Sequence, residues 1–165
     1  MPQPEENDSL VIQTRAKWPI PNDIRPELSR RELQHWVEFW HRRFPDIRLR
    51  SIANVYNCMG LVVACRRVWA YPKDLRKILT DDGCRQLAGP HETEPGDVVI
   101  CHDEDGEPQH VGIVFYREML VPGGNDDPIT LLSKWGGMGE YLHKSKQVPE
   151  VYGRAAEFWT DRRMP

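Results

Sequence analysis

Residues 95–116, with the sequence PGDVVICHDEDGEPQHVGIVFY, contain the pattern that decides the predicted fold. Two apolar runs, at Asp97–Cys101 and His110–Tyr116, lie on either side of a turn at Asp103–Pro108 that is rich in Asp, Glu and Gly. Apolar runs of this length around a glycine-containing turn predict two antiparallel strands. A third strand is predicted at Ile129–Lys134.

Helical patterns precede these strands. Ser29 and Glu32 have the spacing of a capping box, and apolar side chains follow them at helical spacing. A second helix is predicted from about Cys58 to Trp69, with Asn57 as its N-cap, and a short third helix at Lys73–Leu79. Helices followed by an antiparallel sheet predict an α+β domain.

The length of 165 residues fits a single folded domain. Residues 1–28 contain five of the 14 prolines and show little periodicity, so we expect an extended N-terminal arm ahead of a folded domain at residues 29–165. The segment Asp46–Asn57 is predicted as a mixed loop. Arg154–Thr160 is compatible with either a strand or a short helix, and the sequence does not decide between them.

The overall composition excludes several classes of protein. The formal net charge is −3, so no basic excess points to a nucleic-acid partner. No apolar run approaches the roughly 20 residues that cross a bilayer, so no membrane span is expected. The N-terminus lacks a basic region followed by an apolar run, so no secretory signal peptide is expected. We therefore expect that the protein is cytoplasmic as synthesised. Any export would then use a signal-independent secretion system.

The four cysteines form neither a C-x-x-C pair nor a Cys/His cluster with zinc-like spacing. They are Cys58, Cys65, Cys84 and Cys101. We therefore expect reduced thiols, no metal site and no other cofactor. One of these thiols is then available as a nucleophile.

Cys58 directly follows the predicted N-cap Asn57, at the start of a helix. The partial positive charge of a helix N-terminus lowers the pKa of a thiol, and the free N–H groups of the first turn can donate to a developing oxyanion. Gly60 leaves this turn open to a substrate. The alternative is a buried helix cysteine without chemistry, which is the interpretation given to Cys65. We predict that Cys58 is the nucleophile.

A cysteine nucleophile needs an imidazole that takes its proton and later protonates the leaving amine. His110 begins an apolar strand directly after the acidic turn, at a strand end where a sheet presents side chains to a cleft. We predict that His110 is this base. A surface histidine at a strand edge is the alternative, and His102 on the partner strand is the weaker rival.

A third group is expected to accept a hydrogen bond from the other ring nitrogen of His110. If the strand at Ile129–Lys134 pairs antiparallel with the strand of His110, Ser133 and Lys134 lie near the imidazole. A lysine cannot accept a hydrogen bond, whereas a serine hydroxyl can, so Ser133 is predicted as the third catalytic residue. His143 and a backbone carbonyl are the alternatives.

Two blocks of this sequence resemble the NlpC/P60 cysteine peptidases. Tyr56–Val62, with the sequence YNCMGLV, resembles the nucleophile motif of that family at a helix start. Pro95–Val99 and His110–Ile113 resemble its second block, a Pro-Gly-Asp strand entry followed by a His-Val-Gly-Ile strand. The resemblance covers about Ser51–Trp135, half of the chain.

The resemblance implies a papain-like α+β fold, in which helices pack on a small antiparallel sheet and residues 29–165 form the catalytic domain. Cys58 attacks an amide carbonyl in such a fold, and His110 is the general acid and base. The implied function is that of a cysteine peptidase or amidase, specifically a peptidoglycan amidase or endopeptidase, or a toxin-like effector. The implied partner is a peptide or peptidoglycan-type substrate, and an effector would also have an immunity or carrier protein.

Two positions depart from the family pattern. The acidic residue before the nucleophile, which helps to hold a substrate amine, is Asn57 here, and the third catalytic position falls in Ser133–Gly136, with the sequence SKWG. Tyr56 is a candidate second oxyanion donor, Asn57 is a candidate substrate-binding residue, and Trp135 is a candidate cleft residue. The alternative functions are a non-catalytic module that holds a peptide or acyl group on the same fold, and a cysteine acyltransferase.

Overall fold

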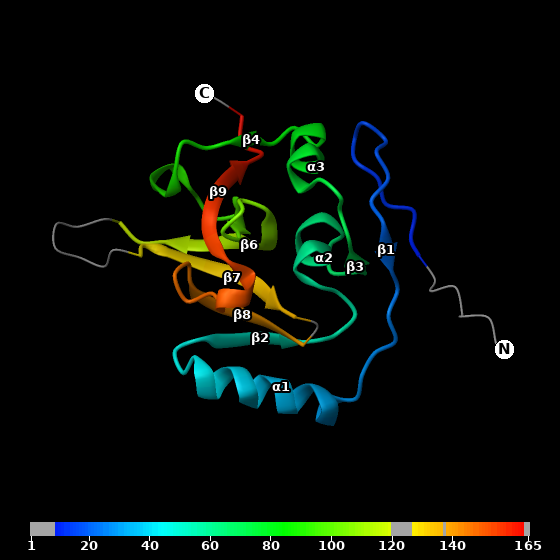
Figure 1. Cartoon of the computed structure of the whole chain (residues 1–165), viewed down its shortest axis with the longest axis vertical. Coiled ribbons are helices and arrows are strands. Elements are labelled where there is room, and N and C mark those ends of the chain that lie inside the picture. The colour runs from blue at the N-terminus through cyan, green and yellow to red at the C-terminus, as the bar shows by residue number, and fades with distance from the viewer. Residues whose placement is uncertain (1–8, 120–126, 137, 164–165) are drawn as a thin grey trace.

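The computed structural model describes residues 9–119, 127–136 and 138–163, and Figure 1 shows its elements. The helices are α1 (Arg30–Arg43), α2 (Cys58–Val63) and α3 (Leu75–Asp81), with the 3-10 turns η1 (Pro90–Glu92) and η2 (Glu150–Tyr152). The strands are β1 (Asn22–Asp23), β2 (Arg48–Ile52), β3 (Trp69–Ala70), β4 (Arg85–Gln86), β5 (Val98–His102), β6 (Pro108–Arg117), β7 (Ile129–Trp135), β8 (Gly139–Lys144) and β9 (Arg154–Thr160).

The centre of the molecule is an antiparallel sheet with the strand order β2-β8-β7-β6-β5-β9-β4. The predicted pairing of the strands around the acidic turn is confirmed, with Cys101 opposite His110. The conditional pairing of the third strand is present too, with Gly112 opposite Ser133. A separate small sheet joins β1 to β3 and holds the described part of the N-terminal arm against the domain.

The expected fold class, with helices packed on a small sheet as in a papain-like protein, is wrong. The described chain is dominated by the seven-stranded sheet, and helical residues account for only 22%. Part of the difference comes from β2 and β8, which the sequence patterns did not reveal. β2 lies in the segment predicted as a loop and is half-exposed, while β8 buries the polar residues Glu140 and His143. Neither strand shows the apolar alternation that identifies a strand in a sequence.

Helix α2 ends at Val63 and not at Trp69 as predicted. Cys65 and Arg66 take positive φ angles of 49° and 66°, through which a right-handed helix does not continue. Cys65 is therefore exposed, and it does not belong to a buried helical stripe.

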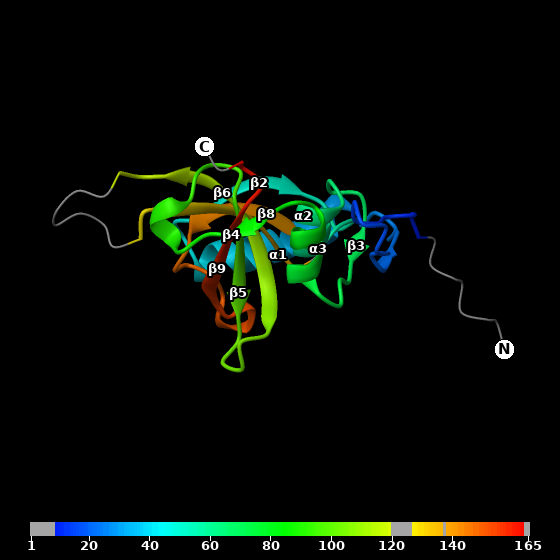
Figure 2. The ribbon, with the colours of Figure 1, turned by 90° about the horizontal axis from the view of Figure 1, so that it is seen from above.

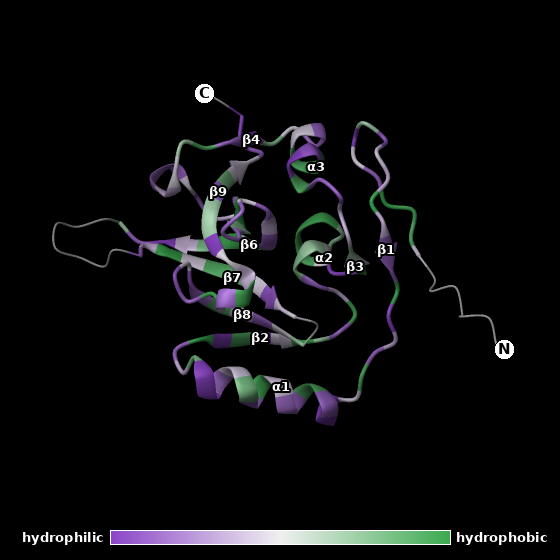
Figure 3. Ribbon diagram, in the orientation of Figure 1, coloured by the Kyte–Doolittle hydropathy of each residue, from purple (hydrophilic) through white to green (hydrophobic). Residues whose placement is uncertain are grey.

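The predicted starts of α1 and α2 are confirmed, whereas α3 begins at Leu75 and not at Lys73. At α1, the Glu32 N–H donates to Ser29 Oγ, and the Ser29 N–H donates to the Glu32 carboxylate at 2.9 Å. At α2, the Gly60 N–H donates to Asn57 Oδ1 at 2.8 Å. Figure 3 shows α2 green to white along its length, whereas purple bands mark α1, so α2 is the more hydrophobic of the two.

The two faces of the sheet carry different covers. We call the side of Ile100 and Val111 the α2–α3 face, because residues of α2 and α3 pack on these two side chains. Side chains alternate along a strand, so Cys101 and His110 point to the opposite side. On this α1 face, α1 and η2 pack against Trp135 and neighbouring aromatic rings. Figures 1 and 2 show α2 and α3 close together, and Figure 1 shows α1 apart from them along β2.

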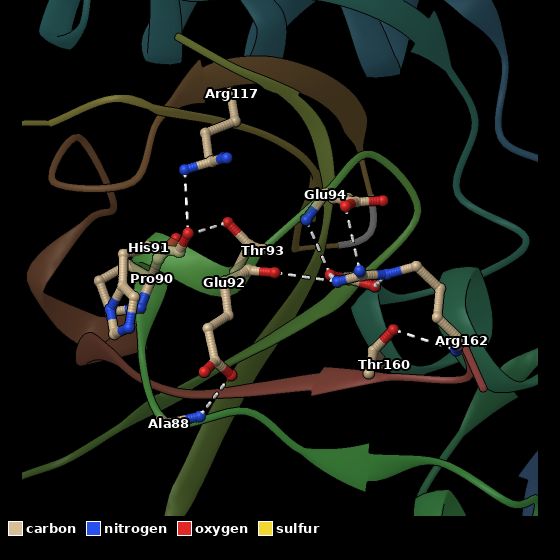
Figure 4. A network of polar contacts seen from close by, with 10 residues as sticks. Ala88, Pro90, His91, Glu92, Thr93, Glu94, Arg117, Thr160 and Arg162 are labelled. Carbon is tan, nitrogen blue, oxygen red and sulfur yellow. Dashed lines mark hydrogen bonds and ion pairs between the residues drawn. The ribbon is translucent and has the colours of Figure 1, made fainter. Parts of the chain in front are cut away.

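Buried Asp97 ties the end of β9 to the start of β5. Its carboxylate accepts hydrogen bonds from the Glu94 N–H at 2.8 Å and from Arg162 Nη2 at 2.6 Å. The same arginine nitrogen donates to the carbonyl of Glu92 at 2.9 Å, within the network of Figure 4. The aspartate of the Pro-Gly-Asp block therefore stabilises the fold. Within the described ranges, no helix is long and apolar enough to cross a membrane.

Candidate active site

Cys58 is the first residue of α2, and Asn57 fixes the position of this helix start. Asn57 Oδ1 accepts from the Ala70 N–H at 3.1 Å as well as from Gly60, and Asn57 Nδ2 donates to the Ala70 carbonyl at 3.0 Å. These bonds attach the helix to β3. Asn57, predicted as a substrate-binding residue, thus has its side-chain atoms engaged in the fold.

Gly60 is needed where the chain doubles back after α2. A Cβ at this position would lie 1.9 Å from the Val68 carbonyl oxygen, a backbone atom that cannot move aside cheaply. Gly60 therefore allows the backbone at Val68 to pack directly against the first turn of α2. The expectation that Gly60 opens this turn to a substrate is not supported by these contacts.

The thiol of Cys58 lies on the α2–α3 face of the sheet. Cys58 is half-buried and packs on the cluster that contains Ile100 and Val111. Burial raises its pKa, while the N–H groups of Val111, Met59 and Cys58 itself and the charge of Lys134 act in the opposite direction. The thiol therefore rests protonated, and a base has to remove its proton before or during nucleophilic attack.

Lys134 is a wholly buried cation on the same face. Its Nζ donates to the Ala53 carbonyl and lies 4.8 Å from the ring centroid of Tyr56. Burial lowers the pKa of Lys134 to about 7, although the charges of Glu140 and Cys58 favour its protonated form. Lys134 and Cys58 are thus coupled electrostatically, so a protonated Lys134 favours the thiolate.

Tyr56 hydrogen-bonds to a neighbouring ion pair. Its hydroxyl donates to Glu140 Oε2 at 2.8 Å, and Arg66 Nε donates to the same oxygen at 2.8 Å. Tyr56 is itself buried. The hydroxyl predicted as an oxyanion donor is therefore occupied by a carboxylate.

His110 lies on the α1 face, opposite the face of Cys58. Its ring stacks on Tyr152 with a centroid distance of 4.3 Å and an interplanar angle of 19°. Both ring nitrogens are buried, and neither has a hydrogen-bond partner among the described residues. Burial, together with the nearby His143, lowers the pKa of His110 to about 3, so the imidazole is neutral at physiological pH. The structure does not bring His110 into hydrogen-bonding contact with Cys58.

Ser133 bonds to His143 and not to His110. Ser133 Oγ lies 2.6 Å from His143 Nε2, and the Trp135 Nε1–H donates to Ser133 Oγ at 3.0 Å. His143 Nδ1 lies 2.8 Å from the Lys144 carbonyl, which can only accept. The proton of a neutral His143 is therefore on Nδ1, and the Ser133 hydroxyl donates to Nε2. Trp135, predicted as a cleft residue, is wholly buried and belongs to this hydrogen-bonded set.

A second histidine does lie on the face of Cys58. His102 Nε2 is 2.6 Å from Glu157 Oε1, and Glu157 is opposite Ile100 in the register of β5 and β9. Arg76 Nε donates to the same carboxylate oxygen at 2.7 Å. This His–Glu–Arg set joins β5, β9 and α3. Sequence reasoning ranked His102 below His110 and missed Glu157 and Arg76.

An open pocket of about 410 Å³ lies between the start of α2, α3 and the turn before β6. Met59, the neighbour of Cys58, lines it on one side, and Arg76 and Pro108 line it on others. Lys73, Asp74 and Lys77 add charged groups to the rim. The pocket therefore places polar binding groups next to the residue that follows Cys58.

Comparisons of the chain with protein-family models, with curated proteins and with solved structures gave no match. The resemblance to the NlpC/P60 peptidases stays a prediction from the two sequence blocks. Among the described residues, no group of three or more His, Cys, Asp or Glu side chains is arranged to hold a metal ion.

Proposed function

We propose that this protein is a cysteine-nucleophile enzyme that cleaves an amide bond of a peptide, with Cys58 as the nucleophile. The environment of the Cys58 thiol is the observation that supports this proposal most strongly. The thiol lies at the start of α2 in a partly buried residue, and both the Val111 N–H and the charge of the buried Lys134 favour its thiolate form.

The chemistry follows from these groups. The Cys58 thiolate attacks the amide carbonyl carbon, the C–N bond breaks, and the amine leaves with a proton that a general acid supplies. Water then hydrolyses the thioester and releases the acid. Lys134 in its charged form stabilises the thiolate, and the Val111 N–H is placed to donate to negative charge that develops near the sulfur.

The substrate proposed first is a peptidoglycan stem peptide, because the two sequence blocks around Cys58 and His110 resemble peptidases of that kind. The test is incubation with purified peptidoglycan, followed by mass analysis of the fragments that are released. Wild type should release peptide fragments and Cys58→Ala should release none. Cys84→Ala, at another half-buried cysteine, is the matched control and should behave as wild type. Equal release by wild type and Cys58→Ala would contradict the proposal.

Water and an external amine compete as acceptors of the acyl group. Adding a primary amine to the same assay distinguishes hydrolysis from acyl transfer, since only a transferase forms the new amide as its main product.

A further inference from the structure

Helix α1 has one covered side and one open side. Leu33 and Val37 are buried on the covered side, toward the sheet. Trp36 and Phe39, by contrast, remain 42% and 38% exposed. Figure 1 shows α1 at the lower edge of the molecule, where no other element lies beyond it. The open side of α1 therefore faces away from the rest of the domain.

The exposed rings on this side form one contiguous group. Trp36 and Phe39 are in edge-to-face contact, with ring centroids 6.0 Å apart, and His35 contacts Trp36 in the same way at 5.9 Å. Residues three and four apart are neighbours on a helix surface, so Arg42 and Arg43 lie next to Phe39, one turn further along. We call the exposed set the α1 ridge, and it consists of Arg31, His35, Trp36, Phe39, Arg42 and Arg43.

The arginines of the α1 ridge have no carboxylate partner. Arg31, Arg42 and Arg43 are exposed, and within the described residues no ion pair or hydrogen bond engages their side chains. The two acidic side chains of α1 are committed to other groups, Glu32 to the capping box and Glu38 to a glutamine one turn earlier. The positive charge of the ridge is therefore available to a partner.

The charge of the chain is unevenly distributed around this helix. Residues 28–50 contain six arginines and three acidic residues, which give a formal charge of +3. The whole chain has a formal net charge of −3, so the remaining residues carry −6. A local excess of one sign in a protein of the other sign indicates a partner that the excess attracts. The ridge is thus the basic part of an acidic protein, and it also carries the exposed rings.

This combination fits the surface of a membrane that contains anionic lipids. Aromatic rings enter the boundary between headgroups and acyl chains, while arginines remain at the level of the lipid phosphates. A protruding helix can lie along an extended surface, whereas a small ligand needs a hollow. The pocket of about 410 Å³ lies elsewhere, at the start of α2 and at α3.

We infer that the α1 ridge binds the surface of anionic lipid membranes, with its two aromatic rings inserted at the headgroup level and its three arginines against lipid phosphates. The binding is peripheral, because aromatic residues of the covered side keep α1 packed on the sheet. Each arginine near an anionic surface contributes roughly fivefold in affinity, so the three contribute on the order of a hundredfold. This property is separate from the proposed chemistry of Cys58.

The test is sedimentation of the full chain with lipid vesicles, followed by measurement of the bound fraction. Wild type should bind vesicles made of equal parts phosphatidylcholine and phosphatidylglycerol, and should bind pure phosphatidylcholine vesicles at least roughly tenfold more weakly. Added salt should release the protein, since it screens the attraction between exposed charges. Equal binding to both kinds of vesicle, or binding to neither, would overturn the inference.

Two double variants locate the binding surface. Arg42→Gln combined with Arg43→Gln should weaken binding to the mixed vesicles by roughly 20-fold. Arg67→Gln combined with Arg154→Gln removes two exposed arginines elsewhere and is the matched control, which should bind as wild type does. Circular dichroism checks that both double variants are folded. If they bind the mixed vesicles equally well, the ridge is not the binding surface and the inference fails.

Trp36→Phe tests the insertion of the rings. Vesicles with brominated acyl chains should quench part of the fluorescence of wild type, and the variant should lose most of that quenching although it still binds. Unchanged quenching would place another of the six tryptophans at the membrane and contradict the inference. A single-stranded oligonucleotide that binds wild type more tightly than the vesicles do, and the ridge double variant weakly, would assign the ridge to nucleic acid instead.

Discussion

The two faces of the central sheet differ in how far their histidines are exposed, although both faces bury polar residues. On the α1 face, Ser133, His143 and Trp135 are joined by buried hydrogen bonds, and both ring nitrogens of His110 are buried without a partner among the described residues. On the α2–α3 face, Cys58 is partly buried and the side chain of His102 is 17% exposed. Closed polar networks in a core specify the packing, whereas open ones beside a pocket can exchange protons with a ligand. This difference is one reason why we propose Cys58, on the α2–α3 face, as the reactive group.

Lys134→Met should give the largest change. The folded-state pKa of Lys134 is about 7, below the ordinary value of 10.5, so burying the charged form destabilises the native state fully below pH 7 and less as pH rises toward 10.5. The variant should therefore exceed wild type by about 3 kcal/mol in unfolding free energy at pH 6, and this gain should shrink by pH 9. Urea denaturation at both pH values measures this.

The same variant should lose reactivity at Cys58, because the cation that favours the thiolate is gone. If Lys134→Met is more stable than wild type at pH 6 and its Cys58 is alkylated more slowly, Lys134 contributes to the reactivity of Cys58 at a cost in stability. An equal or lower stability at pH 6 would mean that the amine is retained for packing.

Ser133→Ala should destabilise the protein without affecting the chemistry. The substitution leaves His143 Nε2 and Trp135 Nε1 buried without their partner, which costs about 2 kcal/mol. Thermal unfolding measures the loss, and the alkylation rate of Cys58 should match wild type. A fall of roughly ten- to a hundredfold in that rate, with the fold intact, would instead support the sequence-based role of Ser133 in orienting a catalytic histidine.

His110→Phe should give the smallest change at neutral pH. Phenylalanine keeps the stacking on Tyr152 and removes two buried nitrogens that have no hydrogen-bond partner among the described residues, so the unfolding free energy should rise by about 1 kcal/mol at pH 7. The folded-state pKa of His110 is about 3, below the ordinary 6.5, so wild type loses stability as pH falls from 6.5 toward 3 and the variant loses less. The advantage of the variant should thus grow between pH 7 and pH 4 in denaturant titrations.

The sequence predicted the parts of the fold that depend on neighbours in the chain. The capping box of Ser29 and Glu32 and the N-cap Asn57 are local patterns, and each marks a helix start in the structure. The pairing around Asp103–Pro108 is also local, since a short turn brings the two apolar runs together. The strands β2 and β8 were missed because polar and half-exposed side chains hide their alternation.

Whether His110 could point at Cys58 depended on which face of the sheet α2 covers. Val111 and His110 are neighbours in one strand, so they cannot both point at the same helix. The apolar α2 needs an apolar partner, and Val111 supplies it, so this alternation was a usable signal against His110. Glu157 and Arg76 could not be found in this way, because the segment of Glu157 was undecided and both residues meet His102 only through tertiary packing.

The central claim, that Cys58 is the nucleophile on the α2–α3 face, is tested most directly by trapping an acyl-enzyme. Incubation with p-nitrophenyl acetate transfers the acetyl group to the thiol and releases p-nitrophenol, and an acid quench followed by peptide mass analysis locates the group. The account predicts an acetyl thioester on the Cys58 peptide of wild type and of His110→Phe, and none at that peptide in Cys58→Ala. Acetylation confined to the exposed Cys65, with Cys58 unmodified, would contradict it.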